Sequence, residues 1–194
     1  MTDHAPLLAP HLEETQEDRL PVLLPVAEMP GATLYLGNRI AADDGALLLE
    51  RGITSTMNLA VNIEMAPLTL ADGTAVRRTH VGLIDGRGNT PPHLLGAALV
   101  LAGILGQESP GKSHYPPHRA GNVLVHCRGG RSRSVSVLAL YLVLAWPELH
   151  PDLETAFRHL RHLRGLPASQ PNANMLALTD AALALSGGPG LLAR

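Results

Sequence analysis

Cysteine, aromatic side chains, lysine and long apolar runs are all scarce in this sequence of 194 residues. Its single cysteine, Cys127, excludes an internal disulfide framework and a cysteine-rich zinc site. One unpaired cysteine is also typical of a reducing compartment, so a cytoplasmic location is expected. Because aromatic residues make up only 3% of the chain, the core must be aliphatic.

The apolar runs are too short to cross a membrane. The longest, residues 94–106 and 135–146, have about a dozen residues each, whereas a spanning helix needs about 20. They predict buried helices and no transmembrane segment. Residues 1–19 lack a basic stretch followed by an apolar block, so no secretory signal is expected either.

Charge is nearly balanced, with a formal net charge of −2 and an isoelectric point near 6.5. A protein that binds duplex nucleic acid is usually clearly basic, so nucleic acid is not an expected partner. Lys112 is the only lysine among 15 cationic residues, and the others are arginine. Arginine suits bidentate binding of phosphate, although a genome-wide codon bias gives the same skew.

The alternation of strand-like and helix-like segments predicts an α/β domain with a central, mixed and mostly parallel sheet of about five strands flanked by helices. We expect this single domain over residues 21–187, after a flexible arm at 1–20 and before a loose tail at 188–194, with a monomer as the default state. The expected strands are 32–36, 53–60, 67–71, 74–84 and 122–126, and the expected helices are 41–50, 93–105, 134–145, 152–164 and 172–185.

Turn residues define the remaining segments. Residues 22–30 contain proline and are expected to form an extended lead-in to the sheet. Asp72-Gly73 predicts a hairpin turn between the third and fourth of the expected strands. Residues 107–121 form a proline-rich loop that leads into 122–126, whose apolar side chains predict a central buried strand.

The most informative segment is VLVHCRGGRSRS, residues 123–134. A buried strand runs into Cys127, Arg133 follows six residues later, and an apolar helix begins at Ser134. A tight loop at a helix N-terminus points its backbone N–H groups inward, and these groups form an anion site together with the helix dipole. Gly129 and Gly130 permit the strained backbone that such a loop needs.

This geometry favours a particular chemistry. Arg133 lies where its guanidinium group can bind two phosphate oxygens. Cys127 lies at the floor of the same loop, where the field that attracts phosphate also favours the thiolate. A thiolate beneath a bound phosphoryl group is placed for in-line attack. The alternative is an ordinary buried cysteine before a glycine turn, which explains neither Arg133 nor its spacing.

Residues 126–134 fit the pattern His-Cys-x-x-Gly-x-x-Arg-Ser, and the sequence resembles the cysteine-dependent phosphatases, most of all their dual-specificity branch. The resemblance extends through 34–58 and more loosely through 158–178, where Pro171-Asn172 matches a recurrent step. It covers about residues 31–185. It implies a phosphatase-type fold, hydrolysis of phosphoric monoesters through a cysteinyl-phosphate intermediate, and no metal or other cofactor.

The resemblance also implies a role for each loop residue. Cys127 is the expected nucleophile, Ser134 stabilises the departing thiolate, and His126 fixes the loop through hydrogen bonds to nearby backbone. The phosphate oxygens are expected to contact the loop from one end to the other, at Arg128, Gly129, Gly130, Arg131, Ser132 and Arg133.

The family also uses a general acid, and Asp85 stands at the expected place, after the strand that precedes the loop segment. The carboxyl ends of parallel strands share one edge of a sheet, so Asp85 and Cys127 should lie near each other. The alternative is an aspartate that caps the turn at Gly86. Asp72 is a poor second choice for the acid.

Three kinds of substrate or ligand remain open. The protein is expected to be a tyrosine or dual-specificity protein phosphatase, a lipid or inositol phosphate phosphatase, or a non-catalytic phosphate-binding module. Residues 62–67 and 86–91 contain no aromatic side chain to sandwich a phosphotyrosine ring, which favours a shallow site. Arg87, Arg128 and Arg131 would suit a polyanionic substrate, or they are tolerated loop variation.

Two other motifs are weaker. Residues 106–113, GQESPGKS, match a nucleotide-binding pattern, but no strand precedes them and no helix can follow. The proline-rich loop that contains them enters the far end of the central strand, so Tyr115 is not expected to stack on substrate. His159 and His162 lie one helical turn apart near His150, yet their arginine neighbours indicate a solvated basic face rather than a metal site.

Overall fold

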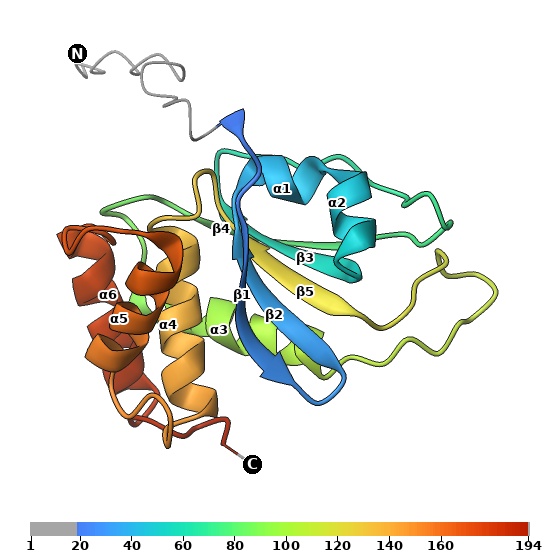
Figure 1. The fold of residues 1–194 in the computed structure, drawn as a ribbon. Coiled ribbons are helices and arrows are strands. Elements are labelled where there is room, and N and C mark those ends of the chain that lie inside the picture. The colour runs from blue at the N-terminus through green and yellow to red at the C-terminus, as the bar shows by residue number, and fades with distance from the viewer. Residues whose placement is uncertain (1–18, 194) are drawn as a thin grey trace, which may run out of the picture.

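The computed structural model describes residues 19–193, which form a five-stranded sheet with helices on both faces (Figure 1). The strands are β1 Leu23–Met29, β2 Ala32–Gly37, β3 Ile53–Ala60, β4 Arg77–Leu83 and β5 Asn122–His126. The helices are α1 Arg39–Asp43, α2 Gly45–Glu50, α3 Pro91–Leu105, α4 Arg133–Ala145, α5 Leu153–Arg164 and α6 Ala173–Leu185. Within this range no helix is both long and apolar enough to span a bilayer.

The strand order is β1-β2-β5-β3-β4, with only the β1–β2 pair antiparallel. The predicted α/β class, the mixed and mostly parallel sheet and the central place of β5 are therefore confirmed. Parallel pairing aligns the carboxyl ends of the inner strands, since His126 stands opposite both Gly37 and Asn58. The chain leaves β5 at Cys127, so this edge of the sheet receives the loop 127–132.

The helices divide between the two faces of the sheet (Figure 1). Helices α1 and α2 cover one face around a small cluster that includes Leu48, Ile53 and Leu124. Helices α3 to α6 cover the other face, where α4 is buried along almost its whole length. A helix that is apolar all round is stable only when surrounded. The sheet and three neighbouring helices surround α4, so the loop before it rests on rigid elements.

Three segments differ from expectation. Residues 23–29 are not merely an extended lead-in, because they pair with β2 as an edge strand, where proline is tolerated. The expected helix at 41–50 is two short helices, because Asp44 ends α1 and caps α2 by accepting a hydrogen bond from the Leu47 N–H group. The expected hairpin around Asp72-Gly73 is reduced to one antiparallel bridge between Thr69 and Ala75.

The expected strand at 67–71 does not form, since the second arm, β4, pairs in parallel with β3 instead. The tail, expected to be loose from residue 188, packs on the end of α4. The Gly190 and Leu192 N–H groups donate to the carbonyl oxygens of Val143 and Leu144 at 3.2 and 2.8 Å. Leu192 also packs against the main core, which explains the attachment. Residues 1–18 of the expected N-terminal arm lie outside the described residues.

Candidate active site

The loop between β5 and α4 is tightly folded against the end of β2. Gly130 adopts a φ of 67°, and a Cβ atom there would lie 2.7 Å from the Gly37 carbonyl oxygen. The Arg39 N–H group donates to the Arg128 carbonyl oxygen at 3.0 Å, which fixes the start of the loop. Of the two loop glycines, Gly130 is the one that needs the left-handed region.

Cys127 lies at the floor of this loop and is only 2% exposed. Its Sγ atom is 3.3 Å from the Ser134 hydroxyl oxygen, on the first turn of α4. Burial by itself raises the pKa of the thiol, but the Arg133 charge and hydrogen bonds from Ser134 and Gly130 outweigh it and lower the pKa below its ordinary value. The thiolate is thus favoured at a position where the helix dipole also supports negative charge.

Arg133 is held in place by a residue that follows β3 and by the last residue of β4. Its Nη1 atom donates to the Asn62 side-chain oxygen at 3.2 Å and to the Leu83 carbonyl oxygen at 3.3 Å. The side chain is 5% exposed, and its Nε atom has no hydrogen-bond partner. A buried donor without an acceptor costs free energy, and a bound oxyanion would supply that acceptor.

Asp85 follows β4 and lies beside this guanidinium group. Its Oδ2 atom is 3.6 Å from the Arg133 Nε atom, and 44% of its side chain is exposed. The turn that carries Asp85 is stabilised by the Asn89 side chain, which accepts a hydrogen bond from the Ile84 N–H group and donates one to the Ile84 carbonyl oxygen. The structure therefore brings Asp85 to the mouth of the Cys127 loop, as the sequence predicted.

Asn172 joins the site, although no role was predicted for it. Its Nδ2 atom donates to the Asp85 Oδ1 atom at 3.0 Å and lies 3.4 Å from the Ser132 hydroxyl oxygen. Its own side-chain oxygen accepts from the Met175 N–H group and caps α6. The sequence signal is only that of a helix N-cap; the contact with Asp85 comes from the packing of α6 against α3 and α4.

His126 is fully buried behind the loop, and its Nδ1 atom lies 3.3 Å from the Cys127 carbonyl oxygen. Since a carbonyl only accepts, the proton is on Nδ1. Burial, together with the charge on Arg78, lowers the pKa of His126 to about 4. The neutral ring therefore fixes the end of β5, in keeping with its expected supporting position.

Several arginines belong to the loop or to the segments next to it. Arg128 and Arg131 are half-buried within the loop, and Arg87 is exposed two residues after Asp85. Arg164, at the end of α5, reaches the loop and donates to the Gly129 carbonyl oxygen at 3.4 Å. This concentration of positive charge attracts an anion although the whole chain is slightly acidic.

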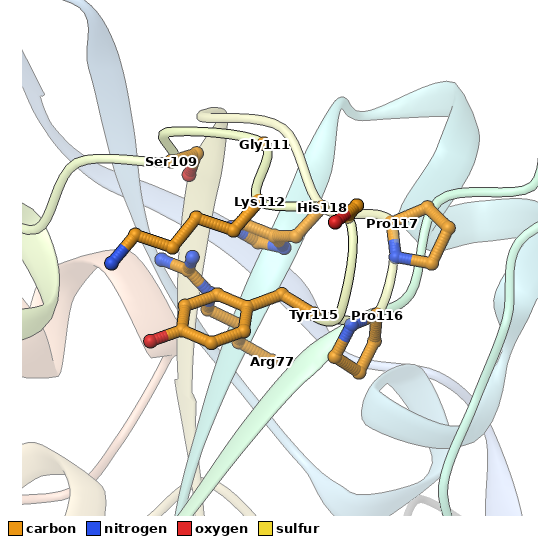
Figure 2. Close-up of a pocket in the computed structure, with 9 residues that line it drawn as sticks. Arg77, Ser109, Gly111, Lys112, Tyr115, Pro116, Pro117 and His118 are labelled. Atoms are coloured by element: carbon orange, nitrogen blue, oxygen red, sulfur yellow. The ribbon is translucent and has the colours of Figure 1, made fainter.

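The proline-rich loop lies at the opposite end of the sheet, where it leads into the start of β5 (Figure 1). Figure 2 shows Tyr115 and Lys112 there, beside Arg77, in a pocket of about 350 Å³. Residues 106–113 neither follow a strand nor open a helix, so they lack the geometry of a nucleotide-binding loop. Tyr115 is remote from Cys127, as expected.

The other discounted residues also lie away from the loop. Asp72 accepts a hydrogen bond from the Thr74 N–H group and pairs with Arg119 at 3.2 Å in the turn before β4. The His159 Nε2 atom is 3.2 Å from the Val26 carbonyl oxygen, and the His150 and His159 rings are 5.4 Å apart. Over residues 19–193 no three potential ligands gather into a metal-binding cluster.

Comparison with known proteins identifies this arrangement at the level of the fold. No family model matches the sequence, and the search of curated proteins finds no match. Many solved structures do match. The fold is that of the dual-specificity phosphatases.

Human DUSP28 is 23% identical, with 84% of this chain and 95% of that chain covered at a TM-score of 0.59. The Yvh1 phosphatase domain from Chaetomium thermophilum is 19% identical, with 86% and 97% covered at 0.61. The human tyrosine phosphatase-like serine/threonine/tyrosine-interacting protein is 21% identical, with 86% and 98% covered at 0.60. The dual-specificity phosphatase fold thus accounts for most of this chain and nearly all of each of those.

The buried neutral state of His126 predicts a pH-dependent stability. The pKa of His126 is about 4 in the folded protein, whereas its ordinary value in an unfolded chain is 6.5. The unfolded chain therefore binds the proton first as the pH falls. Stability should be complete above pH 6.5 and decline by up to about 3 kcal/mol as pH falls towards 4. Urea unfolding at a series of pH values measures this decline.

The variant His126→Gln keeps a donor for the Cys127 carbonyl oxygen and removes the titration, so its stability should change less over the same range. His150→Gln is the matched control, because His150 also has a lowered pKa but is only partly buried. An equal slope in the wild type and in His126→Gln would contradict the neutral buried ring.

Proposed function

We propose that the chain is a phosphoric monoester hydrolase that works through a cysteinyl-phosphate intermediate, of the dual-specificity protein phosphatase type. The observation that supports this most directly is the set of contacts around Cys127. A buried thiol with a lowered pKa lies 3.3 Å from a serine hydroxyl group, and next to the loop the buried Arg133 Nε atom has no hydrogen-bond partner. Asp85 stands beside that guanidinium group.

In the proposed first step, the phosphoryl group binds in the loop between Arg128 and Arg133, with its oxygens held by loop N–H groups and by the Arg133 guanidinium group. The Cys127 thiolate attacks phosphorus, and a P–S bond forms as the ester P–O bond breaks. Asp85 gives its proton to the leaving oxygen. The product is a cysteinyl phosphate and a free alcohol or phenol.

In the second step, Asp85, now a carboxylate, takes a proton from a water molecule that attacks phosphorus. The P–S bond breaks, inorganic phosphate leaves, and the Ser134 hydroxyl group stabilises the returning thiolate. Asn172, the N-cap of α6, acts as a positioning residue for Asp85, because its Nδ2 atom donates to the carboxylate. The scheme balances with water as the only co-substrate.

The substrate is proposed to be a phosphorylated protein held in a shallow site. The segments that flank the mouth, residues 62–67 and 86–91, carry no aromatic side chain that would form a deep wall. A shallow site admits phosphoserine and phosphothreonine as well as phosphotyrosine. Hydrolysis at an open site depends mainly on the loop 127–133 and on Asp85. All three kinds of ester would reach these groups.

A second candidate is a lipid or inositol phosphate phosphatase on the same scaffold. Arg87, Arg128 and Arg131 around the mouth favour it, because a polyphosphorylated headgroup needs cations beyond those of the phosphate loop. A non-catalytic phosphate-binding module is the third candidate, and it fails to account for Asp85 and Asn172 at the mouth.

Replacement of the nucleophile tests the proposal. Cys127→Ser should abolish hydrolysis of 4-nitrophenyl phosphate, because the alkoxide is disfavoured where the thiolate is favoured. Phosphate binding should persist, as measured by calorimetry, because Arg133 and the loop amides remain. The wild type should be inhibited by vanadate. Residual turnover by Cys127→Ser, or a wild type with no activity on any ester, would refute the scheme.

The acid and its positioning residue are tested by the leaving group. Asp85→Asn should slow hydrolysis of alkyl phosphates by about 10²–10⁴-fold and affect esters with good leaving groups less. Asn172→Asp retains the α6 cap but cannot donate to Asp85, and it should cost about tenfold with the same dependence on the leaving group. An equal loss for all esters would mean that Asn172 acts only on structure.

A substrate panel separates the two enzymatic candidates. Phosphotyrosine and phosphothreonine peptides should both be hydrolysed with a higher kcat/KM than phosphoinositides or phosphatidylglycerol phosphate. Arg87→Gln and Arg131→Gln should then change peptide hydrolysis by less than about threefold, since a single phosphate group would be held mainly by Arg133 and the loop N–H groups. A preference for the lipids, lost in these variants, would favour the lipid candidate instead.

A further inference from the structure

Two adjacent arginines on β4 have opposite environments. Successive side chains of a strand point to opposite faces of the sheet. The Arg77 guanidinium group is satisfied, because its Nη1 atom donates to the Gln107 side chain at 3.0 Å and to the Glu108 carbonyl oxygen at 3.3 Å. Arg78 points to the other face, and none of its three guanidinium nitrogens has a hydrogen-bond partner among the described residues.

The Arg78 charge is also poorly compensated. Its side chain is 12% exposed, and its nearest ion-pair partner, Asp43 on α1, lies 3.7 Å away with 68% of its own side chain in solvent. Burial lowers the pKa of Arg78, although arginine stays charged at any ordinary pH. A buried charge without hydrogen bonds is costly, and an anion that accepted from this guanidinium group would offset that cost.

A pocket of about 260 Å³ opens beside this guanidinium group. Its floor is formed by β3 and β4, where Thr56 pairs with Arg78 and Asn58 pairs with His80. Thr56, which stands opposite Arg78 on the same face, adds a hydroxyl group to the lining. These side chains offer hydrogen-bond donors around one positive charge, in a volume suited to a small ion. Glu64 also lines the pocket and is exposed.

We infer that this pocket, centred on Arg78, is a second binding site for a small oxyanion with the chemistry of phosphate or a carboxylate. It is separate from the Cys127 loop, because it lies on β3 and β4 under the segment 61–67 rather than at the start of α4. The guanidinium group would supply a bidentate contact, and the Thr56 hydroxyl group would bind a further oxygen.

The second site is connected to the first through that segment. The Asn58 Nδ2 atom donates to the Ile63 carbonyl oxygen at 2.6 Å, and the neighbouring Asn62 accepts the hydrogen bond from Arg133. Arg78 also contributes to the lowered pKa of His126, which adjoins Cys127. An anion in the pocket therefore lies against groups that hold the arginine of the phosphate loop.

Titration of the full chain with inorganic phosphate tests the inference by amide chemical shifts in nuclear magnetic resonance. Two sets of shifts are expected: one at Thr56, Thr79 and His80, and another in the loop 127–133. Arg78→Met should weaken the first set at least tenfold and leave the second. Succinate should compete with phosphate for the Arg78 pocket. The affinities of the pocket for succinate and for phosphate then show whether it prefers a carboxylate or a phosphate.

Arg77→Met is the matched control, since it removes a neighbouring charge from the opposite face and should leave both sets unchanged. Glu64→Gln should strengthen binding at the pocket. If Arg78→Met does not fold, Arg78→Lys replaces it and should weaken binding several-fold, because lysine cannot bind two oxygens side by side. Shifts confined to the loop 127–133, or pocket shifts that survive without Arg78, would overturn the second site.

The two sets of amides also separate this inference from the proposed reaction. A pocket that binds phosphate in a chain that hydrolyses no ester would leave the second site standing. An active enzyme whose pocket amides do not move would leave the reaction standing and remove the second site.

Discussion

The site depends on one close contact between main chains. The Gly130 backbone passes so near the Gly37 carbonyl oxygen that a Cβ atom would be 2.7 Å from it, and the Arg39 N–H group binds the Arg128 carbonyl oxygen beside it. This contact closes the turn from β5 into α4 and places the Cys127 thiol beneath the first amides of the helix. A wider turn would separate the sulfur from the positive groups that lower its pKa.

Rigid elements support that contact from both sides. Parallel pairing brings Gly37, Asn58 and His126 to the same level of the sheet, so the segments that follow β2, β3 and β5 meet at one edge. Helix α4 cannot shift without opening the core, because it is buried along almost its whole length. The geometry of a small loop is therefore determined by the packing of most of the chain, and the proposed reaction would depend on that packing to position Cys127.

The sequence predicts what is local and misses what is distant. Cys127, Arg133 and Ser134 lie within eight consecutive positions, so strand, turn and helix signals place them without knowledge of the fold. Asp85 is indicated by the family resemblance, and the rule that parallel strands share a carboxyl edge predicts its place near Cys127. Asn62 and Asn172 come from other segments, and their side chains reach the site only through tertiary packing. The edge pairing of β1 and the docking of Leu192 are likewise tertiary, and composition alone suggested extended or loose chain there.

One ion pair connects the two halves of the proposed reaction. Without substrate, the Asp85 carboxylate lies 3.6 Å from the Arg133 Nε atom and shares its charge. In the proposed reaction, a phosphate ester that binds Arg133 would take over that contact and leave Asp85 held by the Asn172 amide. Substrate binding would thus fill the oxyanion site and free the Asp85 carboxylate from its ion pair through the same guanidinium group.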